Sequence, residues 1–164
     1  MSSILVKNIV STETNDLNLL FTQKGKIYTF LNPVSYLTAL DNKKLFEQFD
    51  GIFADGSILV AAIKTLYGKT VTRRSFDMTS LASKLLSYAE KEQKSIYIVA
   101  SQQDQVEKAM EIFKERYPNL IVAGYRNGYF DSEKDMDTEA EKITQINPDF
   151  LIVGMGALMQ EKFL

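Results

Sequence analysis

The sequence contains no histidine, no cysteine and no tryptophan, and only three prolines among its 164 residues. The absence of histidine and cysteine excludes a Ser-His-Asp triad, a cysteine nucleophile, a zinc site built from Cys and His, and any disulfide. An enzyme of this composition must therefore use Asp, Glu, Lys, Tyr or the substrate itself for acid–base chemistry.

The sequence also lacks an excess of basic residues and a long apolar run. Lys and Arg number 19 against 21 Asp and Glu, which argues against a nucleic-acid-binding protein. The longest apolar run, at 150–159, is shorter than the roughly 20 residues that span a bilayer. The first 16 residues have neither the basic start nor the long apolar stretch of a signal peptide. These features predict a cytoplasmic protein and leave contact with a membrane surface open.

Alternating strand and helix patterns predict an α/β fold with a Rossmann-like, mostly parallel sheet flanked by helices. In the second half, runs rich in β-branched residues at 95–100, 120–123 and 150–153 alternate with amphipathic patterns at 103–117 and 132–146. This alternation is typical of right-handed βαβ units.

The first half shows the same alternation less regularly. We expect strands at 27–31 and 51–54, and helices at 33–40, 43–49, 57–67 and 76–93. No segment has the composition of a linker, so the sequence predicts a single domain, residues 1–164, that is large enough to bury a core.

Polar residues that follow strands are the candidate site, because ligands of such sheets bind beyond the carboxyl ends of the strands. Asp55 follows the strand at 51–54 and could deprotonate a substrate hydroxyl. Alternatively, Asp55 caps the helix that begins near Ser57 or makes a turn, and the pattern alone favours this second interpretation.

Two adjacent arginines, Arg73 and Arg74, precede the long helical pattern at 76–93. Guanidinium groups near a helix N-terminus suit a phosphate clamp, and a solvated basic turn is the alternative.

Two weaker patterns argue against particular ligands, namely NAD and calcium. Gly154 and Gly156 permit close approach of the backbone to a ligand, but the full dinucleotide fingerprint is absent, which argues against NAD. The acidic segment 131–137 fails the EF-hand pattern, because Met136 occupies the position that needs glycine. Acidic residues in the first turn of a helix explain this segment better than a calcium site does.

Five segments in combination resemble the WecG/TagA/CpsF glycosyltransferases of bacterial surface-polysaccharide and teichoic-acid assembly. In chain order they are TFLNP, FADGSILVAA, TRRSFDMTSLA, RYPNLIVAGYRNGYF and PDFLIVGMGALMQEKFL. The resemblance rests on the order and spacing of the segments, since none of them is specific alone.

The resemblance implies an inverting, metal-independent transfer without a cofactor. A sugar of the N-acetylmannosamine type, or another hexose, passes from a UDP-sugar to an undecaprenyl-diphosphate-linked acceptor. Asp55 then matches the catalytic base of the family, Asn32 the asparagine of the active-site pocket, and Arg73 the arginine that neutralises the leaving diphosphate.

The same resemblance assigns the remaining substrate-binding residues. Gln160 matches the glutamine near the donor, and Gly154 and Gly156 belong to the same motif. Asp77 matches the acidic residue after the arginine region, where capping of a helix is an equal alternative.

Two of the chain's departures from the family bear most directly on its expected function. Residues 156–160 read Gly-Ala-Leu-Met-Gln, without the usual proline, so we expect a different loop over the donor. Family members typically continue beyond this motif into a basic, aromatic-rich tail. We therefore expect peripheral attachment to the inner face of the plasma membrane through a tail that residues 1–164 lack, and weak transfer activity without it. Self-association through the core is also implied.

A second class of function remains open, namely a catalytically silent nucleotide-sugar-binding module that regulates or scaffolds a polysaccharide assembly complex. The departures near Gln160 favour the module, whereas the retention of Asn32, Asp55 and Arg73 favours the enzyme.

Overall fold

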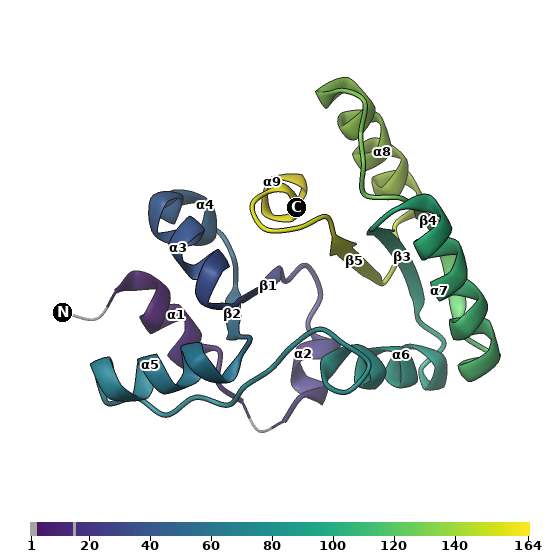
Figure 1. Cartoon of the computed structure of the whole chain (residues 1–164). Coiled ribbons are helices and arrows are strands. Elements are labelled where there is room, and N and C mark those ends of the chain that lie inside the picture. The colour runs from purple at the N-terminus through teal and green to yellow at the C-terminus, as the bar shows by residue number, and fades with distance from the viewer. Residues whose placement is uncertain (1–2, 15) are drawn as a thin grey trace. The chain divides into compact units, whose positions relative to one another are not determined.

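The computed structural model describes residues 3–14 and 16–164 as an α/β protein of two compact units (Figure 1). The units are Met1–Ser83 and Lys84–Leu164, and the boundary falls inside helix α6, Leu81–Lys91. The prediction of a single domain stays a prediction, and each unit is described by itself.

The first unit contains a pair of parallel strands and the helices that surround it. Its elements are α1 (Ile4–Ser11), α2 (Asn18–Thr22), β1 (Tyr28–Leu31), α3 (Pro33–Asp41), α4 (Lys43–Phe46), β2 (Gly51–Ala54) and α5 (Ser57–Tyr67). The two strands pair from Tyr28 with Gly51 to Leu31 with Ala54.

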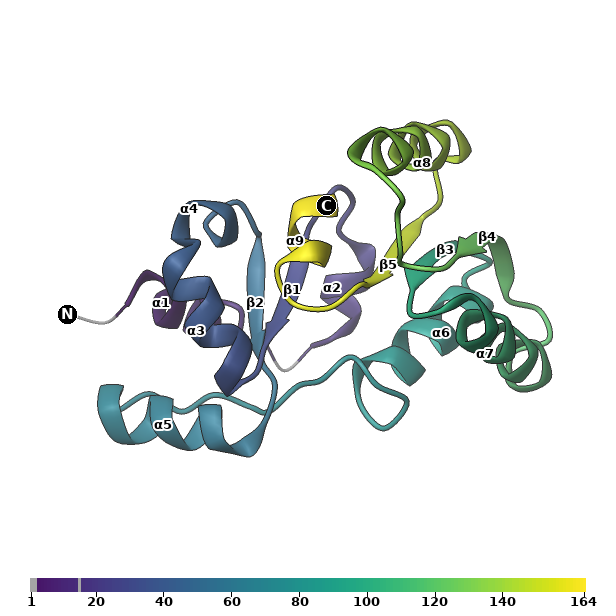
Figure 2. The same ribbon diagram turned by 45° about the horizontal axis from the view of Figure 1, so that its top comes forward.

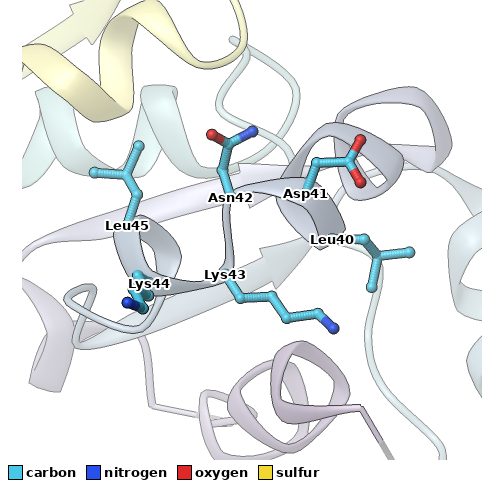
Figure 3. Close-up of a pocket in the computed structure, with 6 residues that line it drawn as sticks. All are labelled: Leu40, Asp41, Asn42, Lys43, Lys44 and Leu45. Carbon is cyan, nitrogen blue, oxygen red and sulfur yellow. The ribbon is translucent and has the colours of Figure 1, made fainter.

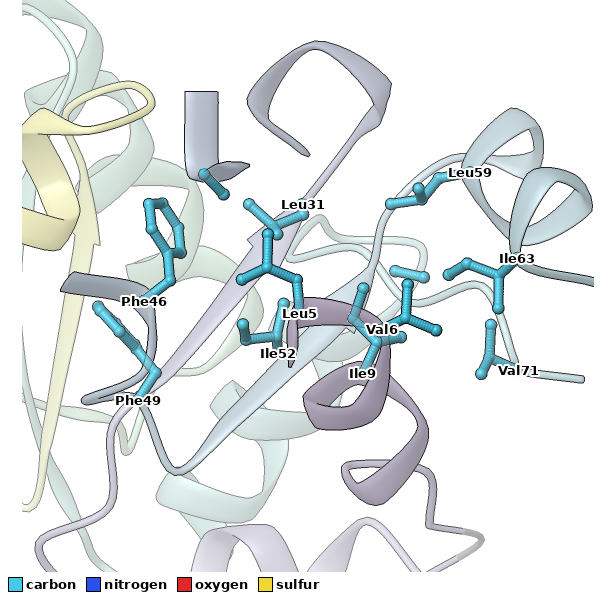
Figure 4. Packing of buried hydrophobic residues seen from close by; sticks show 12 residues of the cluster. Leu5, Val6, Ile9, Leu31, Phe46, Phe49, Ile52, Leu59, Ile63 and Val71 are labelled. Carbon is cyan, nitrogen blue, oxygen red and sulfur yellow. The ribbon is translucent and has the colours of Figure 1, made fainter. Parts of the chain in front are cut away.

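One face of this strand pair carries the core of the first unit. Side chains from α1 meet residues of both strands, of α4 and of α5 (Figure 4). The most deeply buried are Leu5, Val6, Leu31, Phe46, Ile52 and Ile63. The alternate strand residues form an aromatic group on the other face, where the Phe30 ring lies 5.2 Å from that of Phe53 and 5.8 Å from that of Phe76.

The second unit is a three-stranded parallel sheet with the order β4-β3-β5. Its elements are β3 (Ser95–Ala100), α7 (Gln103–Arg116), β4 (Ile121–Arg126), α8 (Glu133–Ile146), β5 (Phe150–Gly154) and α9 (Met159–Phe163). The central strand β3 is the most buried. The chain passes from the central strand to one edge and then to the other, as doubly wound sheets do.

The predicted fold class is confirmed, because every strand pairing is parallel and helices connect the strands (Figure 2). The strands form two separate sheets in the described residues. The helix expected at 76–93 is shorter than predicted, because a turn over residues 77–80 precedes its start at Leu81. Helices α1, α2 and α9 were not expected from the sequence.

The longest helices in the described part of the chain, α7 and α8, have 14 residues each, and none there is both long and apolar enough to cross a membrane.

We predict that helix α1 is essential to the first core. Leu5 is 1% exposed whereas its neighbour Ile4 is 45% exposed. Leu5→Ala is expected to lower the free energy of unfolding by about 2–5 kcal/mol, because it leaves a cavity. Ile4→Ala is the matched control and is expected to cost less than about 1 kcal/mol. Urea unfolding measures both variants, and an equal loss of unfolding free energy in the two would contradict the packing of α1 against the core.

Candidate active site

Asn32 and Asp55 lie next to each other at the carboxyl ends of the two strands of the first sheet. Each directly follows a strand, and the last residues of these parallel strands, Leu31 and Ala54, are paired. The Asp55 amide donates to the Leu31 carbonyl over 2.8 Å, which extends the pairing into the loop. The backbones at Asn32 and Asp55 are therefore about 5 Å apart, the spacing of neighbouring strands.

Asp55 does not cap the helix that follows it. The residue at the start of α5 is Gly56, with a φ of +104°, and no side chain caps the helix. The pattern favoured either a cap or a turn at Asp55, and the capping interpretation is therefore wrong. Its carboxylate makes no hydrogen bond to any residue that the structure describes, and its ion pair is with Arg73, 3.8 Å away.

The two arginines have different roles, so the predicted two-arginine clamp does not form. The Arg74 amide donates to the Ala54 carbonyl over 2.9 Å, which places the segment beside β2. The Arg74 side chain is only 11% exposed, donates to the Thr14 carbonyl and lies 3.8 Å from Glu13. Arg73 is 55% exposed beside Asp55. An exposed ion pair of this kind contributes little to stability. Little free energy is therefore lost if Arg73 leaves Asp55 to pair with an anion.

Glu13 anchors this arginine segment, and sequence reasoning missed it. Its carboxylate accepts hydrogen bonds from the Thr72 amide and hydroxyl at 2.8 Å and 2.5 Å, besides pairing with Arg74. Glu13 thus fixes the backbone on which Arg73 stands. No sequence pattern connects residues that are 59 positions apart.

Asn32 caps helix α3 through its side-chain oxygen. Its side-chain oxygen accepts from the amides of Val34 and Ser35, each at 2.9 Å. The Ser35 hydroxyl accepts in return from the Asn32 amide at 2.8 Å. The side-chain NH2 group of Asn32, an exposed residue, has no partner among the described residues. The predicted role in substrate binding would therefore fall to this group.

Asp77 organises the turn that precedes α6. One carboxylate oxygen accepts from the Thr79 amide and hydroxyl at 2.7 Å and 2.6 Å, and the other accepts from the Ser75 hydroxyl at 2.6 Å. These hydrogen bonds, first that of Ser75, lower the pKa of Asp77 to about 2. The Asp77 side chain thus stabilises the turn that leads into α6, and contact of Asp77 with a substrate stays a prediction.

In the second unit, three loops after strands converge. The Ser101 amide donates to the Gly154 carbonyl over 3.1 Å, and the Gly128 amide donates to the Ser101 carbonyl over 2.9 Å. A Cβ atom at Gly128 would lie 2.9 Å from Cγ of Met155, so any larger residue there requires the Met155 side chain to move. The loops after β3 and β5 meet where the strand order reverses, which is the usual ligand site of doubly wound sheets.

The loop from Gly154 to Gln160 has an unusual backbone. Gly156 has a φ of +88° and open space around it, whereas Leu158 adopts a φ of +73°, which is costly for a residue with a side chain. The buried Glu161 accepts from the Leu158 amide at 2.7 Å and from the Gln160 side-chain NH2 at 3.0 Å. A proline could not adopt the φ of Leu158, so this loop differs from a proline-containing one.

A buried polar network that sequence reasoning missed holds the loop after β4. Glu139, 8% exposed, accepts from the Tyr97 hydroxyl, and Lys142 and Arg126 lie 3.3 Å and 3.8 Å from its carboxylate. Arg126 also donates to the carbonyls of Asn127 and Tyr129 at 3.1 Å and 2.9 Å. Burial, followed by the bond to Glu139, raises the pKa of Tyr97. The network therefore ties the core of the second unit to its strand-end loop.

Two other features lie outside the strand-end loops. A shallow hollow of about 440 Å³, lined by residues 40–45, lies at the turn between α3 and α4 (Figure 3). It is at the opposite end of α3 from Asn32, so it is not part of the strand-end group. No three acidic side chains within 3–14 and 16–164 are grouped closely enough to hold a metal ion. The acidic segment 131–137 begins α8, as predicted, with Ser132 as its cap.

Comparison with known proteins identifies the family. The family model "Glycosyl transferase WecG/TagA/CpsF family" matches residues 4–164. The chain belongs to the WecG/TagA/CpsF family. The resemblance seen in the sequence is thereby confirmed.

Three curated relatives illustrate the range of this family. The chain is 26% identical, over 96% of its length and 66% of the relative, to the UDP-Gal:alpha-D-GlcNAc-diphosphoundecaprenol beta-1,4-galactosyltransferase of Shigella boydii. It is also similar to N-acetylglucosaminyldiphosphoundecaprenol N-acetyl-beta-D-mannosaminyltransferases. That of Bacillus subtilis is 26% identical over 85% of the chain and 54% of the relative. That of Staphylococcus aureus (strain NCTC 8325) is 29% identical over 74% of the chain and 46% of the relative. The chain thus spans about half to two thirds of these WecG/TagA/CpsF proteins.

We predict that Asp77 titrates near pH 2, well below the ordinary 3.8. Because the folded pKa is depressed, the stability that this carboxylate contributes is complete above pH 3.8 and is lost as the pH falls through about 2. Ser75→Ala removes the largest cause and is expected to raise the pKa towards 3.8 in a carboxyl NMR titration. Asp50 is the control, because Lys26 and the Ile27 amide lower its pKa instead. A pKa of Asp77 that Ser75→Ala leaves unchanged would refute this assignment.

The buried network is expected to be important for stability. Tyr97→Phe removes the hydroxyl that donates to Glu139 inside the unit and is expected to lower the free energy of unfolding by about 1–3 kcal/mol. Tyr125→Phe on the neighbouring strand is the control, because Tyr125 is 41% exposed. Urea unfolding measures both, and a Tyr97→Phe variant as stable as the control would show that the network is dispensable.

Proposed function

We propose that this chain carries out glycosyl transfer from a UDP-sugar to an undecaprenyl-diphosphate-linked acceptor, with Asp55 as the base. The observation that carries the proposal is the position of the Asp55 carboxylate. It lies at the strand-end edge, without a hydrogen bond to the described residues, beside the exposed Arg73. The relatives are named for diphosphoundecaprenol-linked acceptors and in one case for a UDP-sugar donor, which supports the choice of substrates.

In the proposed reaction, the acceptor hydroxyl oxygen attacks the anomeric carbon of the donor. The bond from that carbon to the β-phosphate oxygen breaks, and its electron pair leaves with UDP. The hydroxyl proton passes to the Asp55 carboxylate, and attack from the face opposite the leaving group inverts the configuration. The step needs no oxidant or cofactor.

Charge and position complete the proposed mechanism. Negative charge develops on the β-phosphate, and the Arg73 guanidinium is suited to stabilise it by bidentate hydrogen bonds. The free NH2 group of Asn32 would orient a substrate oxygen close to Asp55. Gly154, Gly156 and Gln160 of the second unit are proposed to bind the donor, because their loop lies at the reversal point of its sheet.

The donor is proposed to be a hexose-type sugar, because the relatives are named for galactose and for N-acetylmannosamine. We also propose peripheral attachment to the inner face of the plasma membrane and self-association, both of which rest on the family resemblance.

The alternative, a silent nucleotide-sugar-binding module, is favoured by one observation. The loop at the proposed donor site contains Leu158 in a left-handed conformation, and the side-chain NH2 group of Gln160 donates to the Glu161 carboxylate. Binding of UDP without turnover would establish this alternative.

We predict that Asp55→Asn lowers kcat by about 10²–10⁴-fold while binding of UDP is retained, because the amide cannot accept the proton. Turnover of UDP-sugar with a GlcNAc-diphospholipid acceptor measures the effect. Asp104→Asn, at an exposed aspartate in the first turn of α7, is the control and is expected to leave kcat unchanged. Equal rates for the Asp55→Asn variant and the unaltered chain would remove Asp55 as the base.

A further inference from the structure

Glu161 is a buried carboxylate beside the loop that follows β5 in the second unit. Only 3% of its surface is exposed, and it stands on α9, a helix of five residues. Its carboxylate accepts from the Leu158 amide at 2.7 Å and from the side-chain NH2 group of Gln160 at 3.0 Å. A carboxylate is costly to bury unless it accepts hydrogen bonds, so these contacts hold Leu158 and Gln160 firmly.

The bond to Glu161 fixes the direction of the Gln160 carboxamide. A carboxylate can only accept hydrogen bonds, so Gln160 must turn its NH2 group, and not its oxygen, towards Glu161. The oxygen, Oε1, accepts no hydrogen bond from any residue within 3–14 and 16–164. Gln160 therefore has an unused hydrogen-bond acceptor, held in one orientation by its neighbour.

Gln103 on α7 provides a direct comparison. Its side-chain NH2 group donates to Glu107 at 2.6 Å, as that of Gln160 does to Glu161. The Gln103 oxygen, however, accepts from the Asn127 side chain at 3.2 Å, so both ends of this carboxamide are used within the protein. The carboxamide of Gln160 is held at its NH2 end, and its oxygen is open to a ligand.

The backbone before Gln160 is strained. Leu158 adopts a φ of +73° and a ψ of −38°, which is costly for a residue with a side chain. Glu161 accepts from the amide of this same residue, so one carboxylate stabilises the strained backbone and the Gln160 side chain together. Gly156, two residues earlier, has open space around it. Strain that a fold maintains in such an open loop is typical of ligand-binding sites.

Helix α9 is anchored to the rest of the second unit by aromatic contacts. Five residues are too few for a helix to be stable by itself in water. The Phe163 ring stacks on that of Phe130 at 5.4 Å, and the Arg126 guanidinium lies 4.0 Å from the centre of the Phe130 ring. Arg126 also pairs with the buried Glu139. The helix that carries Glu161 is therefore held in place by the buried network of the unit.

We propose that Glu161 is a positioning residue, which directs the Gln160 oxygen to accept a hydrogen bond from a hydroxyl group of the nucleotide-sugar donor. This inference rests on the proposed function. A hydroxyl can donate to a carboxamide oxygen, whereas an ionised phosphate oxygen can only accept. The pair of Glu161 and Gln160 thus recognises a hydroxyl of the donor's hexose or ribose, and not its diphosphate.

Glu161 also caps α9. It is the third residue of the helix, from which a glutamate commonly reaches back to the amide that precedes the helix. Capping alone accounts for the bond to Leu158, but it does not require the bond to Gln160. The two roles predict different results when substitutions at 160 and 161 are combined.

The test is a double-mutant cycle on the binding of UDP-galactose and UDP-N-acetylmannosamine, measured by titration calorimetry with the 164-residue chain. Gln160→Ala is expected to weaken binding of the preferred donor by about three- to tenfold, the contribution of one hydrogen bond. Glu161→Gln is expected to cause a similar loss, because the new carboxamide can donate to the Gln160 oxygen and occupy it. The double variant is expected to lose no more than either single variant, because Glu161 acts through Gln160.

UDP distinguishes the two sources of the hydroxyl. If the hexose supplies it, Gln160→Ala weakens binding of the UDP-sugar and leaves binding of UDP unchanged. If the ribose supplies it, binding of both is weakened by the same factor.

Glu107→Gln is the matched control, because it removes the charge of the carboxylate that holds Gln103. It is expected to leave donor binding unchanged. Thermal unfolding midpoints equal to that of the unaltered chain would show that the variants are folded. The Gln160 NH2 signals in NMR provide a measurement that needs no variant, and we expect them to stay protected from solvent exchange when the donor binds.

Four results would overturn the proposal. They are donor binding that Gln160→Ala leaves unchanged, losses that multiply in the double variant, an equal loss with Glu107→Gln, and loss of protection of the Gln160 NH2 group on binding. Each of these leaves the proposed function intact, whereas the absence of any nucleotide binding by the unaltered chain would overturn both. The assay requires no sugar transfer, so the role of Asp55 is tested separately by the Asp55→Asn turnover measurement.

Discussion

The parallel register of β1 and β2 is the constraint on which the proposed site depends. Leu31 pairs with Ala54, and the hydrogen bond from the Asp55 amide to the Leu31 carbonyl continues this pairing by one residue. Asn32 and Asp55 are consequently side by side although they are 23 positions apart in the sequence. A slip of one residue would move Leu31 and Ile52 from the core face to the aromatic face, so burial of the core enforces the register. The same packing that stabilises the fold therefore fixes the geometry of the site.

Arg73 and Arg74, which are adjacent in the sequence, have different roles beside this strand pair. Arg74 is buried against Glu13 and the Thr14 carbonyl, while its own amide binds β2. Arg73, the next residue along the backbone, is thereby held near Asp55 with its side chain exposed. A buried cation that is paired in the fold supports an exposed cation that is available to an anionic substrate. The second unit uses the same principle, because Glu139 and Arg126 stabilise the loop that follows β4.

The sequence predicted the features that arise from local patterns. The apolar run at 51–54 and the apolar density at 57–67 identified β2 and α5 with their observed bounds. Because polar residues after parallel strands gather at the carboxyl ends of the strands, the sequence also pointed to Asn32 and Asp55. The contribution of α1 to the core depends on contacts with strands some 20 to 50 residues away, and no local pattern reports these. Glu13 and Glu139 were missed for the same reason. The assignment of Asp55 as a cap was wrong because Gly56, with its positive φ, starts the helix itself.

The most direct test of the strand-end site is NMR mapping of UDP binding on the isotope-labelled chain. We expect the largest shift in the side chain of Arg73, since its guanidinium is proposed to bind the nucleotide diphosphate. Shifts confined to the hollow at residues 40–45, with Arg73 unchanged, would contradict the assignment of the site to the carboxyl ends of the strands of the first unit.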